Sequence, residues 1–215
     1  MLWCSALDAT TGRTDIGEMT EMRIIGGIAG GIRLQAPAGR SIRPTEDRVK
    51  ESMFGILGDL RGKTALDLFS GTGALGLEAL SRGAAAVFFF EKERQHVDFI
   101  KRNLAAVQKS MGPGAGKTEV FCADAKKAPE LLPDVHPDII LADPPYAATA
   151  QEYGAAGLLL DNAMACWAGR NCILVLEHAA DNVLPWDEQT HWKLLRSRTY
   201  GIRAVSFAIG GEEND

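Results

Sequence analysis

The stretch Leu66-Asp67-Leu68-Phe69-Ser70-Gly71-Thr72-Gly73-Ala74-Leu75-Gly76 decides the fold, because it reads as a strand, a glycine turn and the start of a helix. The three glycines of this stretch satisfy the G-x-G-x-x-G pattern of nucleotide-binding turns. Glu91 lies 20 residues beyond Gly71, where an acid can accept hydrogen bonds from a ribose. These features predict a nucleotide cofactor, and taken alone they are compatible with NAD.

Two further features favour S-adenosylmethionine over NAD. Asp67 is an acid inside the strand just before the turn, where it suits the cationic amino group of a methionine and would repel a pyrophosphate. The second feature is the tetrapeptide Asp143-Pro144-Pro145-Tyr146, which ends an apolar run about 70 residues beyond Gly71 and has no role in hydride transfer. Together they predict methyl transfer to an exocyclic amine.

The tetrapeptide suits a nucleobase amine, which is a poor nucleophile because its lone pair is delocalised into the ring. The Asp143 carboxylate and a neighbouring backbone carbonyl can accept both amine hydrogens and localise that lone pair. Pro144 and Pro145 lack N–H donors and fix φ, so the turn is stiff, and Tyr146 can stack on the base. The structural alternative is that Pro-Pro merely ends a strand and Tyr146 is a turn aromatic, which is common for isolated Pro-Pro pairs.

The rest of the chain predicts an α/β fold with a mostly parallel sheet, since short apolar runs alternate with helical patterns. Helices are expected at Ala74–Arg82 and Leu158–Trp167, and between them a helix with Val97, Ile100, Leu104 and Val107 on one face. Parallel strands are expected at Thr64–Phe69, Ala85–Phe90, Thr118–Cys122, Ile139–Ala142 and Cys172–Leu176. The C-terminal runs, His191–Tyr200 and Ile202–Ile209, leave little room for a helix and predict an antiparallel hairpin.

Three regions are expected along the chain: a disordered leader (1–21), an N-terminal extension that contacts RNA (22–62) and the catalytic domain (63–215). The extension should contain a short bent β-ribbon at Arg23–Leu34 and a helix capped by Thr45. Although the whole chain has a net charge of −5, residues 22–50 carry six basic residues against two acidic ones. A basic segment on an acidic protein suits an anionic partner, although many clusters of this size are simply solvated.

Composition argues against several other classes of protein. The four cysteines form no CxxC pair and no cluster with histidine, so we expect neither a metal site nor a disulfide framework. No apolar run is long enough to span a bilayer. Residues 1–21 resemble neither a secretory signal nor a transit peptide, so we expect a cytoplasmic protein. Met1, Met19 and Met22 are the candidate start residues.

At the level of a family, the sequence resembles the bacterial 16S rRNA (guanine-966)-N-2 methyltransferases from about Met22 to the terminal hairpin. The glycine turn and the Asp-Pro-Pro-Tyr motif are shared by many amino methyltransferases and are moderately specific. The resemblance also includes Met22-Arg23-Ile24-Ile25-Gly26-Gly27 and Asp47-Arg48-Val49-Lys50-Glu51. The segments that narrow it to this family are Arg43-Pro44-Thr45 and Gly73-Ala74-Leu75-Gly76-Leu77-Glu78-Ala79-Leu80.

The resemblance implies a Rossmann-like class I methyltransferase fold, S-adenosylmethionine as donor and, as substrate, a guanine in 16S rRNA of the small subunit or its assembly intermediate. It also implies a monomer. The catalytic residues would be Asp143, Pro144, Pro145 and Tyr146. The cofactor-binding residues would be Thr45, Asp67, Phe69, Ser70, Gly71, Thr72, Gly73, Glu91, Lys92, Asp124 and Ala125. The RNA-binding residues would be Arg23, Arg33, Arg40, Arg43 and Arg48.

Several alternatives stay open at this point. Asp124 could contact adenine or merely cap a helix, and Arg43 and Arg48 could form salt bridges within their helix. Gly30 and Ile32 stand where the family usually has basic residues, which weakens the expected grip of the ribbon on RNA. The competing functions are a DNA adenine methyltransferase, a ribosome-assembly binding protein with little turnover and, more distantly, a nicotinamide oxidoreductase.

Overall fold

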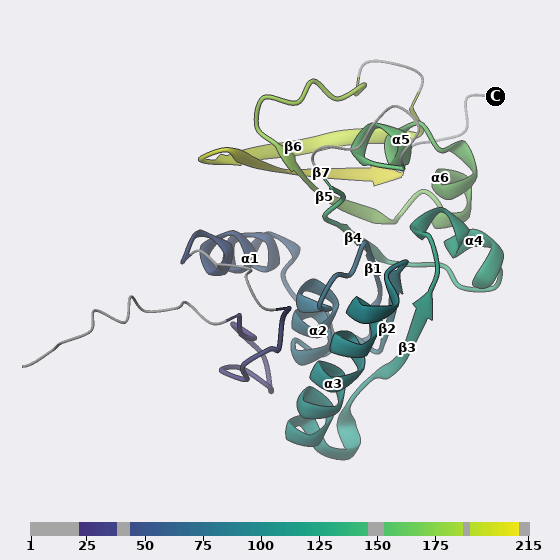
Figure 1. The fold of residues 1–215 in the computed structure, drawn as a ribbon. Coiled ribbons are helices and arrows are strands. Elements are labelled where there is room, and N and C mark those ends of the chain that lie inside the picture. Colours follow the sequence, from purple (N-terminus) through teal and green to yellow (C-terminus); the bar gives the residue numbers. More distant parts are fainter. Residues whose placement is uncertain (1–21, 38–43, 146–152, 187–189, 211–215) are drawn as a thin grey trace, which may run out of the picture.

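The structure, a computed structural model, describes residues 22–37, 44–145, 153–186 and 190–210. Its centre is a seven-stranded sheet in the order β3-β2-β1-β4-β5-β7-β6 (Figure 1). The strands are β1 (Thr64–Leu68), β2 (Ala86–Glu91), β3 (Lys117–Cys122), β4 (Ile139–Ala142), β5 (Ile173–Ala179), β6 (Trp192–Tyr200) and β7 (Arg203–Gly210). Strands β1 to β5 pair in parallel, whereas β7 runs antiparallel to β5 and β6. The predicted parallel sheet with an antiparallel C-terminal hairpin is therefore confirmed.

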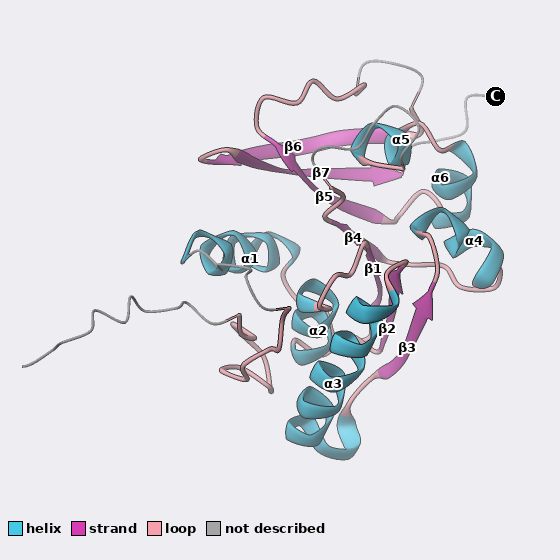
Figure 2. Ribbon diagram, viewed as in Figure 1, coloured by secondary structure: helices cyan, strands magenta, loops and turns pink. Residues whose placement is uncertain are grey.

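Helices cover both faces of this sheet (Figure 2). They are α1 (Pro44–Leu57), α2 (Ala74–Ser81), α3 (Arg94–Met111), α4 (Ala128–Leu131), α5 (Ala155–Leu159) and α6 (Asn162–Ala168), with single 3₁₀ turns at Gly112–Gly114 and Ala125–Lys127. Strand β2 shows why two layers are needed: Val87 and Phe89 join the core under α1 to α3, whereas Phe88 and Phe90 join the core that contains α5 and α6. A strand buried on both faces reads as a continuous apolar run. No helix in the described ranges has the length and apolar character needed to cross a membrane.

Two helix predictions were wrong in detail. The helix expected over Leu158–Trp167 is split into α5 and α6, because the Asp161 side chain accepts a hydrogen bond from the Met164 N–H (3.0 Å) and starts a second helix. The helix expected to be capped by Thr45 already begins at Pro44. Proline has a φ suited to the first helical position, which places Thr45 inside the first turn.

The predicted N-terminal ribbon is reduced to one antiparallel bridge, between Arg23 and Arg33. The reason is that the backbone between them binds helix α2. The buried Glu78 carboxylate accepts from the Ile25 and Gly26 N–H groups (2.7 and 2.8 Å), and Ser81 Oγ accepts from the Ala29 N–H (2.9 Å). These bonds replace the ladder that a longer ribbon would need.

Gly27 explains the double glycine of this segment. It has a φ of +80°, and a Cβ built there would lie 2.0 Å from the Ser81 carbonyl oxygen. Only glycine combines this conformation with so close an approach to another backbone. The extension, meaning residues 22–37 together with α1, is therefore fitted directly to the end of α2.

Candidate active site

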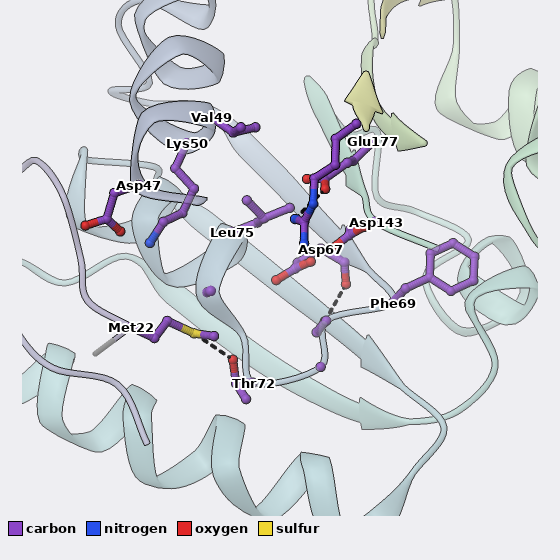
Figure 3. A pocket seen from close by; sticks show the side chains of 14 residues that line it. Met22, Asp47, Val49, Lys50, Asp67, Phe69, Thr72, Leu75, Asp143 and Glu177 are labelled. Carbon is purple, nitrogen blue, oxygen red and sulfur yellow. Dashed lines mark hydrogen bonds and ion pairs between the residues drawn. The ribbon is translucent and has the colours of Figure 1, made fainter. Parts of the chain in front are cut away.

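A cavity lies at the carboxyl ends of β1, β4 and β5, which is where ligands bind in open α/β sheets (Figure 3). One side of it is formed by the glycine turn from Phe69 to Thr72, and another by Asp143 and the end of β5. The third side comes from the extension, which contributes Met22, Asp47, Val49 and Lys50. The extension therefore forms part of the wall of the site.

The glycine turn has an unusual backbone. Gly71 and Gly73 have positive φ angles, and so does Phe69, at 63°. A bulky residue in the left-handed region is rare, and such residues cluster at functional sites. Thr72 Oγ1 contacts Met22 Sδ at 3.1 Å, and Asn103 on α3 donates to the Thr72 carbonyl while exchanging two hydrogen bonds with the backbone of Gln35. The turn and the extension are thus held together by side chains.

Asp67 is buried beneath the turn, with one carboxylate oxygen accepting from the Gly76 N–H (2.8 Å) in the first turn of α2. Asp67 therefore caps the start of α2 and also lines the cavity. Burial raises the pKa of this carboxyl to about 7, the Gly76 bond opposes that rise, and the negative charge of Glu91 adds to it. A cation placed beside Asp67 would lower this pKa.

Four of the other predicted cofactor residues lie at or just after the ends of β2 and β3 and do not line the cavity: Glu91, Lys92, Asp124 and Ala125. Glu91 accepts from the N–H groups of Gly71 (2.7 Å) and Glu93 (2.9 Å), so it links the turn to the end of β2. Asp124 caps the 3₁₀ turn at Ala125 through the Lys126 N–H (3.1 Å), as its structural alternative predicted. Lys92 follows Glu91 and Ala125 follows Asp124 in the sequence, and neither lines the cavity. Gly73 of the glycine turn does not line it either. The side chain of Thr45 is outside the described part.

Asp143 follows β4 directly and is exposed within the cavity. Pro144 is buried and Pro145 is exposed, while Tyr146 lies outside the described residues. Since β4 pairs with β1, Asp143 comes close to the glycine turn although about 70 residues separate them in the chain. Asp67 and Asp143 both line this cavity (Figure 3).

The predicted RNA-binding arginines are only partly brought together. Arg23 and Arg33 are exposed neighbours across the bridge, and Arg23 forms an ion pair with Asp47 at 3.1 Å. Arg48 is exposed on α1. Arg40 and Arg43 lie outside the described residues.

Four charged residues that line the cavity were not predicted as site residues: Asp47, Lys50, Glu177 and Arg203. Lys50 is buried on α1 and donates to the Arg23 carbonyl (2.6 Å), and Glu177 of β5 forms an ion pair with Arg203 of β7 (2.8 Å). Glu177 directly follows the predicted strand Cys172–Leu176, as Asp143 follows Ile139–Ala142, and that position was the available signal. Nothing local indicated Arg203, because its place depends on the register between β5 and β7.

The chain is similar in sequence and in structure to known methyltransferases. The sequence model of a family described as "Conserved hypothetical protein 95" matches residues 22–209. The curated "Ribosomal RNA small subunit methyltransferase D" of Haemophilus influenzae is 34% identical over 190 residues, which cover 88% of this chain and 93% of the relative. The solved structure of yhhF from Escherichia coli superposes with a TM-score of 0.70 at 32% identity, covering 90% of this chain and 99% of that one.

A more distant structure shares the fold alone. The rRNA methyltransferase aviRa from Streptomyces viridochromogenes has a TM-score of 0.62 at 18% identity, covering 85% of this chain and 91% of that one. The Rossmann-like class I methyltransferase fold that the resemblance implied is therefore confirmed. The chain belongs to the "Conserved hypothetical protein 95" family and is related to proteins named ribosomal RNA small subunit methyltransferase D, so the predicted resemblance to a family of 16S rRNA methyltransferases is confirmed.

Proposed function

We propose that the protein transfers the methyl group of S-adenosylmethionine to the exocyclic N-2 amine of a guanine in 16S rRNA of the small ribosomal subunit. The observation that carries the proposal is the meeting of Asp67 and Asp143 in one cavity, at the ends of the adjacent strands β1 and β4. Relatives that share a third of the sequence are named rRNA small subunit methyltransferases, which supports this substrate class.

The residues of the cavity fit the methyl donor. Four carboxylates line it, those of Asp47, Asp67, Asp143 and Glu177, against the two cations Lys50 and Arg203. This balance favours a ligand that carries positive charge. We propose that Asp67 binds the amino group of the cofactor and that the backbone of Ser70–Thr72 passes close to it. When bound, the cofactor supplies an electrophilic methyl group on a sulfonium sulfur.

Asp143 and the Pro144 carbonyl would act on the amine. By accepting its two hydrogens they localise the nitrogen lone pair and orient it toward the cofactor side of the cavity. This contribution is positioning and charge placement, so it needs no covalent intermediate. Tyr146 is proposed to stack on the base after the base has left its stack in the RNA. We further propose that the protein works in the cytoplasm as a monomer.

Incubation with radiolabelled S-adenosylmethionine and small subunits that lack the modification tests the proposal. Nuclease digestion and mass spectrometry are expected to map the label to N-2 of one guanine in 16S rRNA. Label on adenine in duplex DNA, with none on subunits, would instead support a DNA adenine methyltransferase. Binding of subunits without any label would support an assembly factor with little turnover.

The raised pKa of Asp67 predicts that cofactor affinity depends on pH. Because a bound amino cation favours the carboxylate, binding should release a proton where the free carboxyl is protonated, below about pH 7. We expect S-adenosylhomocysteine to bind roughly tenfold more tightly at pH 7.5 than at pH 6.0, measured by isothermal titration calorimetry.

The same raised pKa affects folding in the opposite direction. Protonation of Asp67 favours the folded protein, whereas it weakens the proposed binding of the cofactor. A pKa raised above its ordinary value of 3.8 gives stability that is complete below about 3.8 and is lost as the pH rises through about 7.

Asp67→Asn should remove the pH dependence of cofactor binding and weaken the affinity for S-adenosylhomocysteine at pH 7.5. A wild-type affinity that does not change between the two pH values would contradict the proposed contact.

A further inference from the structure

The order of the sheet divides the cavity around Asp143. Strand β4, which ends at Asp143, lies between β1, which leads into the glycine turn, and β5, which carries Glu177. Asp143 therefore has the glycine turn on one side and Glu177 on the other. If the cofactor occupies the side of the glycine turn, the ring that carries the amine must extend toward β5 and β7.

That side of the cavity carries an ion pair. Arg203 Nη1 lies 2.8 Å from Glu177 Oε1, and both residues line the cavity. The antiparallel register explains the contact: Glu177 is opposite Val205 and Ala179 is opposite Arg203, so the two charged residues are diagonal neighbours on one face of the sheet. The Glu177 side chain is 6% exposed and that of Arg203 is 27% exposed.

We propose that Glu177 and Arg203 form a base-recognition subsite that reads the N1–H and O6 edge of guanine, an inference that rests on the function proposed above. In guanine, the exocyclic amine lies between two ring nitrogens. One of them, N1, is an N–H donor, and the next group along that edge is the O6 carbonyl acceptor. In adenine and cytosine, the ring nitrogen beside the amine is an acceptor. A carboxylate next to a guanidinium complements the guanine pattern, since the carboxylate only accepts and the guanidinium only donates.

The chemistry of the pair suits this role better than a structural one. A guanidinium carries five N–H donors and a carboxylate has about four acceptor positions, so the two can hold each other and still face a ligand. A largely buried ion pair usually adds little net stability compared with apolar side chains of similar size. Its position on the cavity wall, beside Asp143, is where a base held by its amine would present its remaining edge.

The test compares two bases on two enzymes. Small subunits are assembled with 16S rRNA that carries either guanine or 2-aminopurine at the methylated position. 2-Aminopurine keeps the reactive amine but lacks both O6 and the N1 hydrogen. The enzymes are the wild type and the double variant Glu177→Leu/Arg203→Met, in which both charges are removed so that neither remains unpaired. For each enzyme we take the ratio of the rate on guanine to the rate on 2-aminopurine. Any difference in reactivity between the two amines themselves affects both enzymes equally, so it cancels when the two ratios are compared.

For the wild type we expect kcat/KM to fall by about 10²- to 10³-fold when guanine is replaced by 2-aminopurine, because a site built to hydrogen-bond a base penalises an analogue that lacks those groups. For the double variant the ratio should fall below about tenfold, mainly through loss of activity on guanine. The matched control is Lys63→Met/Asp138→Asn, which removes an exposed ion pair just before β1 and β4, at the opposite end of the sheet. It should keep the wild-type ratio.

Two outcomes would overturn the inference. One is a double variant that keeps the full discrimination, whether its rates are unchanged or fall by the same factor on both bases. The other is a wild type that methylates both bases equally well. Binding of S-adenosylhomocysteine by the double variant shows whether it is folded. If it is not, Arg203→Lys takes its place, and it should lose part of the discrimination while keeping a charge. A wild type that labels no guanine at all refutes the proposed function instead, so the two failures are distinguishable.

Discussion

Asp143→Ala is expected to reduce methyl transfer by about 10³-fold while leaving cofactor and RNA binding close to wild type. The reason is that the carboxylate would act on the amine only as it becomes nucleophilic, and groups of this kind typically contribute 10²- to 10⁴-fold. Asp143 also lies at the end of β4, exposed within the cavity, so its removal should cost little stability. Single-turnover kinetics on unmodified small subunits would measure the effect.

The matched control for this variant is Asp134→Ala, which removes an exposed carboxylate from the loop before β4. It should behave as the wild type does. An Asp143→Ala enzyme that retains more than about a tenth of the wild-type rate would show that Asp143 does not orient the amine. Loss of RNA binding in the same variant would instead give Asp143 a role in holding the substrate.

Glu78→Ala is expected to produce the largest loss of stability, about 3–5 kcal/mol in the free energy of unfolding. Glu78 is fully buried and accepts from the N–H groups of Ile25 and Gly26 and from Arg82 Nε (2.8 Å). Its removal leaves a guanidinium and two backbone donors without this acceptor, and each has a desolvation penalty. Urea unfolding followed by circular dichroism would measure the change.

The same variant should also weaken the site, because the segment that Glu78 holds continues into Met22 and contacts Thr72 of the glycine turn. We expect weaker binding of S-adenosylhomocysteine even at temperatures where the variant is folded. Glu130→Ala, at an exposed position of α4, is the control and should change stability by less than about 0.5 kcal/mol. A loss below about 1 kcal/mol for Glu78→Ala would mean that the extension is held mainly by other contacts.

The fold of the sheet and the glycine turn was predictable where it depends on neighbouring residues. The glycine turn, the acid before it and the acid-proline-proline turn each lie within a few consecutive residues, and β1, β2, β3 and β4 appear where the apolar runs stand. The extension was predicted less well. Its ribbon became a single bridge because Glu78 and Ser81 satisfy its backbone, and no local pattern shows which distant side chain will do that.

By itself, the sequence determined the class of fold, the family and the two acids, Asp67 and Asp143, on which the proposed chemistry depends. Only the tertiary structure decided what surrounds them. The parallel pairing of β1 with β4 brings the two acids into one cavity, and the antiparallel register of β5 and β7 adds Glu177 and Arg203 to its far wall. The physical reason is that a strand and its turn are specified by neighbouring residues, whereas strand order and register depend on the packing of the whole sheet.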